Sequence, residues 1–149
     1  MTTQKYTVLI TDPNAIKQLD FVHPPTGVRS IRIRSIHYPY LLSAAGESGS
    51  LCIVVDVAGV SRSKTEIHHV IAGTNTACSA VCNFSNAYAS GTFPHVWEDD
   101  GAILLDGCMM SQLSLSLFYV PTDGTTRVYI PLIAGNAIVI QLDITADVW

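Results

Sequence analysis

Apolar and polar residues alternate with a period of two through most of the last third of the chain. Leu113, Leu115 and Leu117 are separated from one another by single serines. A strand would place all three leucines on one face, whereas a helix would scatter them around its axis. Similar alternation covers residues 128–132 and 138–144. The pattern therefore predicts three strands, each with one apolar face.

Two turn signals separate these three runs. The segment PTDG at residues 121–124 combines a proline of fixed φ, an aspartate that can bond its own backbone and a glycine that accepts positive φ. The dipeptide GN at residues 135–136 gives the second signal. Three strands joined by two tight turns predict an antiparallel meander with one buried apolar face, and we expect Ile140 to lie on that face.

Earlier segments predict further strands. Residues 5–10 (KYTVLI) and 28–38 (VRSIRIRSIHY) have strand character, and 51–57 (LCIVVDV) is apolar on both faces except for Asp56, which indicates a strand covered on both sides. Residues 15–22 fit either a helical turn or a short strand. A turn is expected at the segment EDDG, and shorter strands are expected at residues 67–71, 77–84, 93–97 and 102–105.

These elements define an all-β fold. About eight to ten strands, no long amphipathic helix and regularly spaced turn signals are typical of a sandwich. We predict one domain, residues 1–149, that forms an antiparallel two-sheet sandwich, most simply a single jelly roll of about eight strands. An immunoglobulin-type sandwich is the alternative, but too little chain separates Trp97 from Cys108 to hold its intervening strands.

The composition changes the interpretation of the outer faces. Apolar residues make up 48% of the chain and charged residues 13%, which is about half the usual charged share. No stretch approaches the ~20 apolar residues of a membrane span. Because Ser114 and Ser116 stand where charged residues are common, we predict that their face contacts another subunit. An ordinary β domain with a Ser/Thr-rich exterior is the alternative.

The charge pattern argues against nucleic-acid binding. The net charge is −4, and the chain has only eight lysines and arginines. Arg32 and Arg34 alternate with isoleucines and should share one strand face, for which we favour a solvated surface over a phosphate-binding one. We keep both arginines as candidate interface residues. The first residues lack the apolar core of a signal peptide, so the four cysteines are expected to be reduced.

No catalytic or metal-binding motif stands out. Cys78, Cys82 and Cys108 have no local signal of a base and an orienting group, and buried thiols are the ordinary case. His68 and His69 are adjacent and would point to opposite faces of a strand, so they cannot easily bind one ion. We therefore expect neither an enzyme nor a cofactor or metal site.

Carbohydrate binding is the alternative function. Trp97 could stack on a sugar ring, and it is followed directly by the carboxylates of Glu98, Asp99 and Asp100. Jelly rolls include lectins, so the predicted fold allows this function. The three carboxylates lack the ligand spacing of a known calcium loop and more often form a solvated tip.

Three segments of the sequence carry a resemblance to a known family. They are VRSIRIRSIHYP at residues 28–39, LCIVVDVAGV at 51–60 and FYVPTDGTTRVYIPLIAGNAIVIQLDI at 118–144. Over about residues 28–145, the chain resembles the single jelly-roll structural proteins of double-stranded DNA viruses, of the penton or minor capsid type.

The resemblance implies a non-enzymatic capsid subunit of the virion, assembled in the host cytoplasm or nucleus. Its expected partners are copies of itself, with five copies closing a vertex, and other capsid proteins. The family has no active site, so no catalytic residue is implied.

Overall fold

The computed structural model describes residues 1–39, 49–57, 67–71, 74–84, 95–98, 102–121, 130, 132 and 135–149. Eleven strands lie in this part of the chain: β1 (Thr2–Ile10), β2 (Lys17–Asp20), β3 (Thr26–Tyr38), β4 (Gly49–Asp56), β5 (Ile67–Ile71), β6 (Thr74–Cys78), β7 (Ala80–Phe84), β8 (His95–Glu98), β9 (Ala102–Cys108), β10 (Gln112–Pro121) and β11 (Ile138–Val148).

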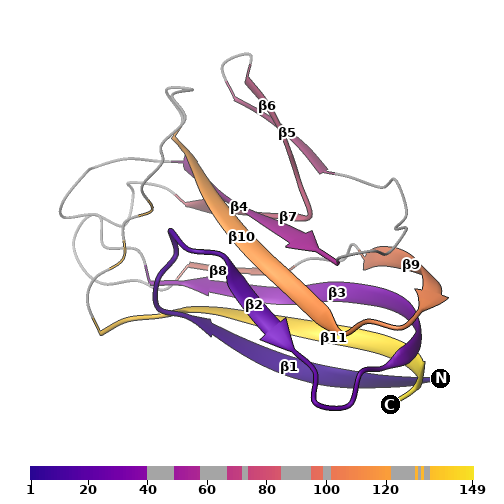
Figure 1. The fold of residues 1–149 in the computed structure, drawn as a ribbon. Helices are drawn as coiled ribbons and strands as arrows, with labels where there is room; N and C mark the ends of the chain where they lie inside the picture. The colour runs from indigo at the N-terminus through magenta and orange to yellow at the C-terminus, as the bar shows by residue number, and fades with distance from the viewer. Residues whose placement is uncertain are drawn as a thin grey trace.

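Most of the strands form two antiparallel sheets that pack face to face (Figure 1). The first sheet has the order β1-β11-β3-β8, and β9 also pairs with β3. The second sheet has the order β2-β10-β4-β7. A separate hairpin, β5–β6, lies on the side of the second sheet that faces away from the first. The prediction of an all-β, antiparallel two-sheet sandwich is therefore confirmed.

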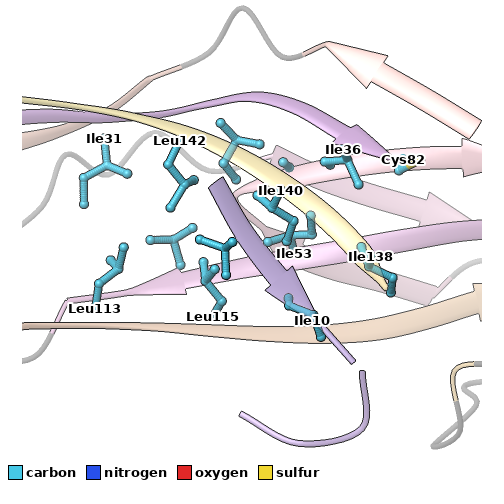
Figure 2. Close-up of a cluster of buried hydrophobic side chains, with 14 of the residues drawn as sticks. Ile10, Ile31, Ile36, Ile53, Cys82, Leu113, Leu115, Ile138, Ile140 and Leu142 are labelled. Carbon is cyan, nitrogen blue, oxygen red and sulfur yellow. The ribbon is translucent and has the colours of Figure 1, made fainter. Parts of the chain in front are cut away.

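The core lies between the two sheets. Ile138, Ile140 and Leu142 of β11 face Leu113 and Leu115 of β10 across it (Figure 2), and each of these side chains is at most 1% exposed. The alternating burial of β11 reflects the alternation of its sequence, because successive side chains of a strand point to opposite faces. The face predicted for Ile140 is confirmed.

The predicted C-terminal meander is wrong. The strand at β10 lies in the second sheet between β2 and β4, whereas β11 lies in the first sheet between β1 and β3. Each of the two strands therefore lies between strands from distant parts of the chain, and no middle strand pairs with both of them. The turn PTDG and most of the strand expected at 128–132 lie outside the described residues. Alternation identified β10 and β11 correctly, whereas the two described residues of the run at 128–132, Ile130 and Leu132, lie outside any strand. Alternation carries no information about strand partners.

The turn expected at EDDG lies outside the described residues except for Glu98. The strands on either side of it, β8 and β9, pair with successive parts of the same edge of β3: Glu98 lies opposite Ser35, and Ala102 lies opposite Arg32. Both strands run antiparallel to β3 and therefore in the same direction. Together they occupy one strand position of the first sheet.

The single strand expected at 77–84 is wrong, because β6 ends at Cys78 and pairs with β5, whereas β7 begins at Ala80 and belongs to the second sheet. Several other expectations are met. Residues 67–71 form a strand, and the ambiguous segment 15–22 contains β2. The strand β4 is central in its sheet, and its residues Leu51 to Ile53 are fully buried on both faces, as the apolar run at 51–57 predicted. Within the described residues, no helix is long and apolar enough to cross a membrane.

Replacing Ile140 with Ala should destabilise the fold by about 2–5 kcal/mol, because the side chain is fully buried in the core. Urea unfolding measures this loss. The matched control is Val139→Ala, which changes the next residue on the outer, partly exposed face of β11 and should cost much less. Equal losses for the two variants would contradict the faces assigned to β11.

Candidate functional site

The outer face of the first sheet carries half of the cations of the protein. Lys5 on β1 and Arg29, Arg32 and Arg34 on β3 are all exposed, and the chain has eight lysines and arginines in all. We refer to these four residues as the cationic face. Arg32 and Arg34 share it, as predicted, although the pairing of β3 with β11 is irregular.

Two β-bulges place arginines on this face. The register of β3 against β11 shifts by one residue between Gln141 and Leu142, and again between Thr145 and Ala146. In each case the extra residue of β3 is an arginine, Arg34 or Arg29. A bulge leaves one residue unpaired in the ladder and increases the local twist, so these side chains can lean toward β11.

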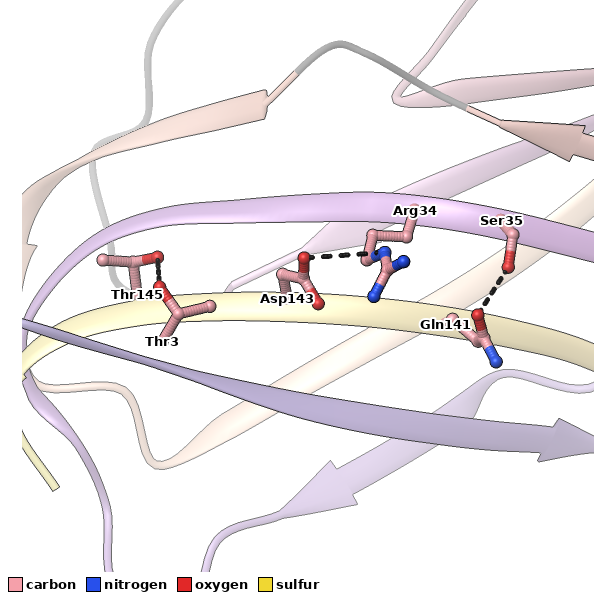
Figure 3. A network of polar contacts seen from close by, with 6 residues as sticks. All are labelled: Thr3, Arg34, Ser35, Gln141, Asp143 and Thr145. Atoms are coloured by element: carbon pink, nitrogen blue, oxygen red, sulfur yellow. Dashed lines mark hydrogen bonds and ion pairs between the residues drawn. The ribbon is translucent and has the colours of Figure 1, made fainter.

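Both bulge arginines form ion pairs with aspartates of β11. Arg29 Nη2 donates to Asp147 Oδ2 across 2.8 Å, and this hydrogen bond holds the pKa of Asp147 below its ordinary value. Arg34 Nε lies 3.8 Å from Asp143 Oδ2 (Figure 3). Gly27 leaves room for the first pair: its φ is 65°, and a Cβ there would lie 2.5 Å from Asp147 Oδ2.

Neutral hydrogen bonds link the strands beside these ion pairs. Thr3 Oγ1 and Thr145 Oγ1 are 2.7 Å apart, and Ser35 Oγ donates to Gln141 Oε1 across 2.9 Å (Figure 3). A depression of about 140 Å³ lies beside the ion pair of Arg34 and Asp143, and Lys5 and Gln141 also line it. The face is thus polar and carries more cations than carboxylates, which suits a contact with another surface better than the enclosure of a small molecule.

The outer face of the second sheet is poor in charge around β10. Ser114 and Ser116 are half-buried and point away from the core, opposite Asp56 and Val54 of β4. The orientation predicted for both serines is confirmed. We call Ser114, Ser116, Val54 and Asp56 the serine face. Toward the β5–β6 hairpin it continues into an apolar cluster of Cys52, Cys78, Val81 and Val120, with Val54 and Phe118 packed against it.

The described thiols are buried. Cys52, Cys78 and Cys82 are free, and each is at most 5% exposed. A hydrogen bond with Cys78, together with burial, raises the pKa of Cys52. Burial raises the pKa of Cys82 to about 12, so this thiol is protonated at neutral pH and is a poor nucleophile.

A groove that the sequence analysis missed lies at the end of the sandwich where both termini meet (Figure 1). It has a volume of about 480 Å³, and Tyr6, Phe21 and Trp149 line it together with polar residues. These three aromatic residues lie far apart in the sequence. No local pattern brings them together. The pairing of β1 with β11 places Trp149 near Tyr6, and Phe21, which follows β2 of the second sheet, packs edge-on against the ring of Tyr6.

The predicted carbohydrate site is only partly described. Trp97 and Glu98 are consecutive residues of β8, opposite Ile36 and Ser35 of β3. Asp99 and Asp100 lie outside the described residues. Binding at these four residues stays a prediction.

The geometry defines a two-sheet β-sandwich with two contrasting outer faces and one end groove. Comparison with protein-family models, curated proteins and solved structures finds no significant match to this chain.

Replacing Asp147 with Asn should remove a contribution to stability that depends on pH. Because the bond from Arg29 lowers the pKa of Asp147 in the folded state, the contribution is complete above the ordinary aspartate pKa of about 3.9 and is lost as the pH falls through the lower folded value. We expect the native protein to exceed the variant slightly in stability near pH ~7, and the difference to vanish near pH ~2.

Urea unfolding at a series of pH values measures this difference. Asp56→Asn, which removes an exposed carboxylate from the second sheet, serves as the control. A difference for Asp147→Asn that stays constant down to pH ~2 would contradict the role of the ion pair.

Proposed function

We propose that this protein is a non-enzymatic structural subunit of a virion, a penton or minor capsid protein with a single jelly-roll fold. It assembles with copies of itself, in the pentameric manner that the family resemblance implies, and contacts other capsid proteins. The proposal rests first on the order in which the strands pair.

The pairing supports a jelly roll because the first half of the chain pairs with the second half in reverse order. The observed pairs are β1 with β11, β2 with β10, β3 with β8 and β9, and β4 with β7. This is the arrangement of one long antiparallel hairpin, and the further pairs β3–β11 and β4–β10 roll it into two sheets. With β8 and β9 counted as one position, eight strand positions result, as in jelly rolls of viral capsids.

The two outer faces support assembly. Ser114 and Ser116 offer hydroxyls beside Val54, and Asp56 is the one charged member of the serine face. A low density of charge is typical of the centre of a protein interface. Arg32 and Arg34 lie on the opposite side of the sandwich. They can contact acidic residues of a neighbouring copy, because the chain as a whole has a net charge of −4. The two faces differ in chemistry, so they suit different neighbours.

A lysine on the serine face should weaken self-association more than it affects folding. We expect Ser114→Lys and Ser116→Lys each to raise the dissociation constant at least about tenfold, because a charge would be buried in the contact. Light scattering coupled to size-exclusion chromatography measures the assembly, and thermal unfolding measures the fold.

Ser111→Lys is the matched control, because it adds the same charge at an exposed residue just before β10. It should leave the dissociation constant unchanged. A native protein that stays monomeric at high concentration and binds no capsid component would contradict the proposal. If Ser111→Lys weakens assembly as much as Ser114→Lys does, the serine face is not the subunit contact.

A further inference from the structure

The end groove is built where the two sheets have their open edges. Gln4 and Tyr6 come from β1, the edge strand of the first sheet, and Asp20 ends β2, the edge strand of the second. Phe21, Val22 and His23 follow β2, and Trp149 follows β11. The groove volume of about 480 Å³ falls in the range of small-molecule sites.

Three aromatic rings form the apolar part of the groove. The ring centroids of Tyr6 and Phe21 are 5.7 Å apart with perpendicular planes, and those of Tyr6 and Trp149 are 6.1 Å apart with planes inclined by 32°. All three side chains are partly buried against the core. The rings are therefore held by packing while part of each remains open to a ligand.

Hydrogen bonds fix these rings in place. Trp149 Nε1 donates to the carbonyl of Thr2 across 3.0 Å, and the Tyr6 hydroxyl donates to Gln4 Oε1 across 3.1 Å. The backbone amide of Phe21 donates to the carbonyl of Ser111 across 3.2 Å. A site whose rings are already anchored loses little side-chain entropy when a ligand binds.

Polar groups line the rim of the groove. The exposed carboxylate of Asp20 can accept hydrogen bonds, and Gln4, whose Oε1 accepts the bond from Tyr6, still has its amide NH₂ group to donate. The imidazole of His23 lies at the same rim. An apolar peptide or lipid would leave these groups buried without partners, which is costly. The negative charge of Asp20 disfavours a phosphate-bearing ligand.

We propose that this groove binds a neutral pyranose ring of a glycan. One apolar C–H face of the sugar stacks on the rings of Trp149 and Tyr6, as aromatic faces allow. The hydroxyls of the sugar donate to Asp20 and accept from Gln4. The site is separate from Trp97, and it does not depend on the assembly through the serine face.

Saturation-transfer NMR on the whole protein tests the proposal, with the methyl glycosides of glucose, galactose, mannose and N-acetylglucosamine as probes. We expect saturable binding of at least one of them. Trp149→Ala should weaken it at least about tenfold through loss of the stacked ring, and Asp20→Asn by about tenfold through loss of a charged acceptor. Asp12→Asn, at an exposed carboxylate between β1 and β2 that belongs to neither the groove nor the serine face, should leave binding unchanged.

Asp20→Asn is the decisive variant if Trp149→Ala impairs folding, because the Asp20 side chain is exposed. The absence of saturable binding up to about 10 mM of every probe, well above a dissociation constant of ~1 mM, would overturn the proposal. Binding that survives both substitutions would also overturn it. If Trp149→Ala instead changes the oligomeric state and no sugar binds, the groove is a subunit contact, and the sugar site is rejected while the assembly stands.

Discussion

The whole sandwich depends on the burial of one face of β11 between β1 and β3. Ile138, Ile140, Leu142 and Ile144 of this strand are each at most 1% exposed, and burying one such side chain contributes on the order of 1.5–3 kcal/mol. A shift of the register by one residue would turn all four to solvent. Because these four side chains point inward, the residues between them point outward. There Asp143 and Asp147 form ion pairs with Arg34 and Arg29 of β3.

The sequence was informative wherever burial repeats with a regular period. Alternation predicted β10 and β11, the buried face of Ile140 and the outward direction of Ser114 and Ser116. It could not assign strand partners, because β10 and β11 each pair with segments of the first half of the chain, and so the meander was wrong. One break in the alternation is a signal of the bulge at Arg34. Isoleucines follow one another at a spacing of two up to Ile33, but the next one, Ile36, is three residues further on, and both are buried. The groove around Trp149 has no such local signal.

The proposed function rests on how charge is distributed over the two outer faces of the sandwich. The first sheet exposes four of the eight cations, in part neutralised by Asp143 and Asp147, whereas the second presents serines and apolar side chains around β10. A sandwich with one charged and one weakly hydrated face is suited to repeated contacts with neighbours. The end groove lies away from both faces at the open edges of the sheets, and it could bind a ligand in an assembled particle.

The central claim is that copies of this sandwich associate through the serine face. An electron-microscopic reconstruction of the assembled protein tests it most directly. We expect closed oligomers of identical subunits, pentamers as the family resemblance implies, in which Ser114 and Ser116 lie at the boundary with a neighbour. Assembled particles that leave both serines open to solvent, or preparations with no species larger than the 16.1 kDa chain, would contradict it.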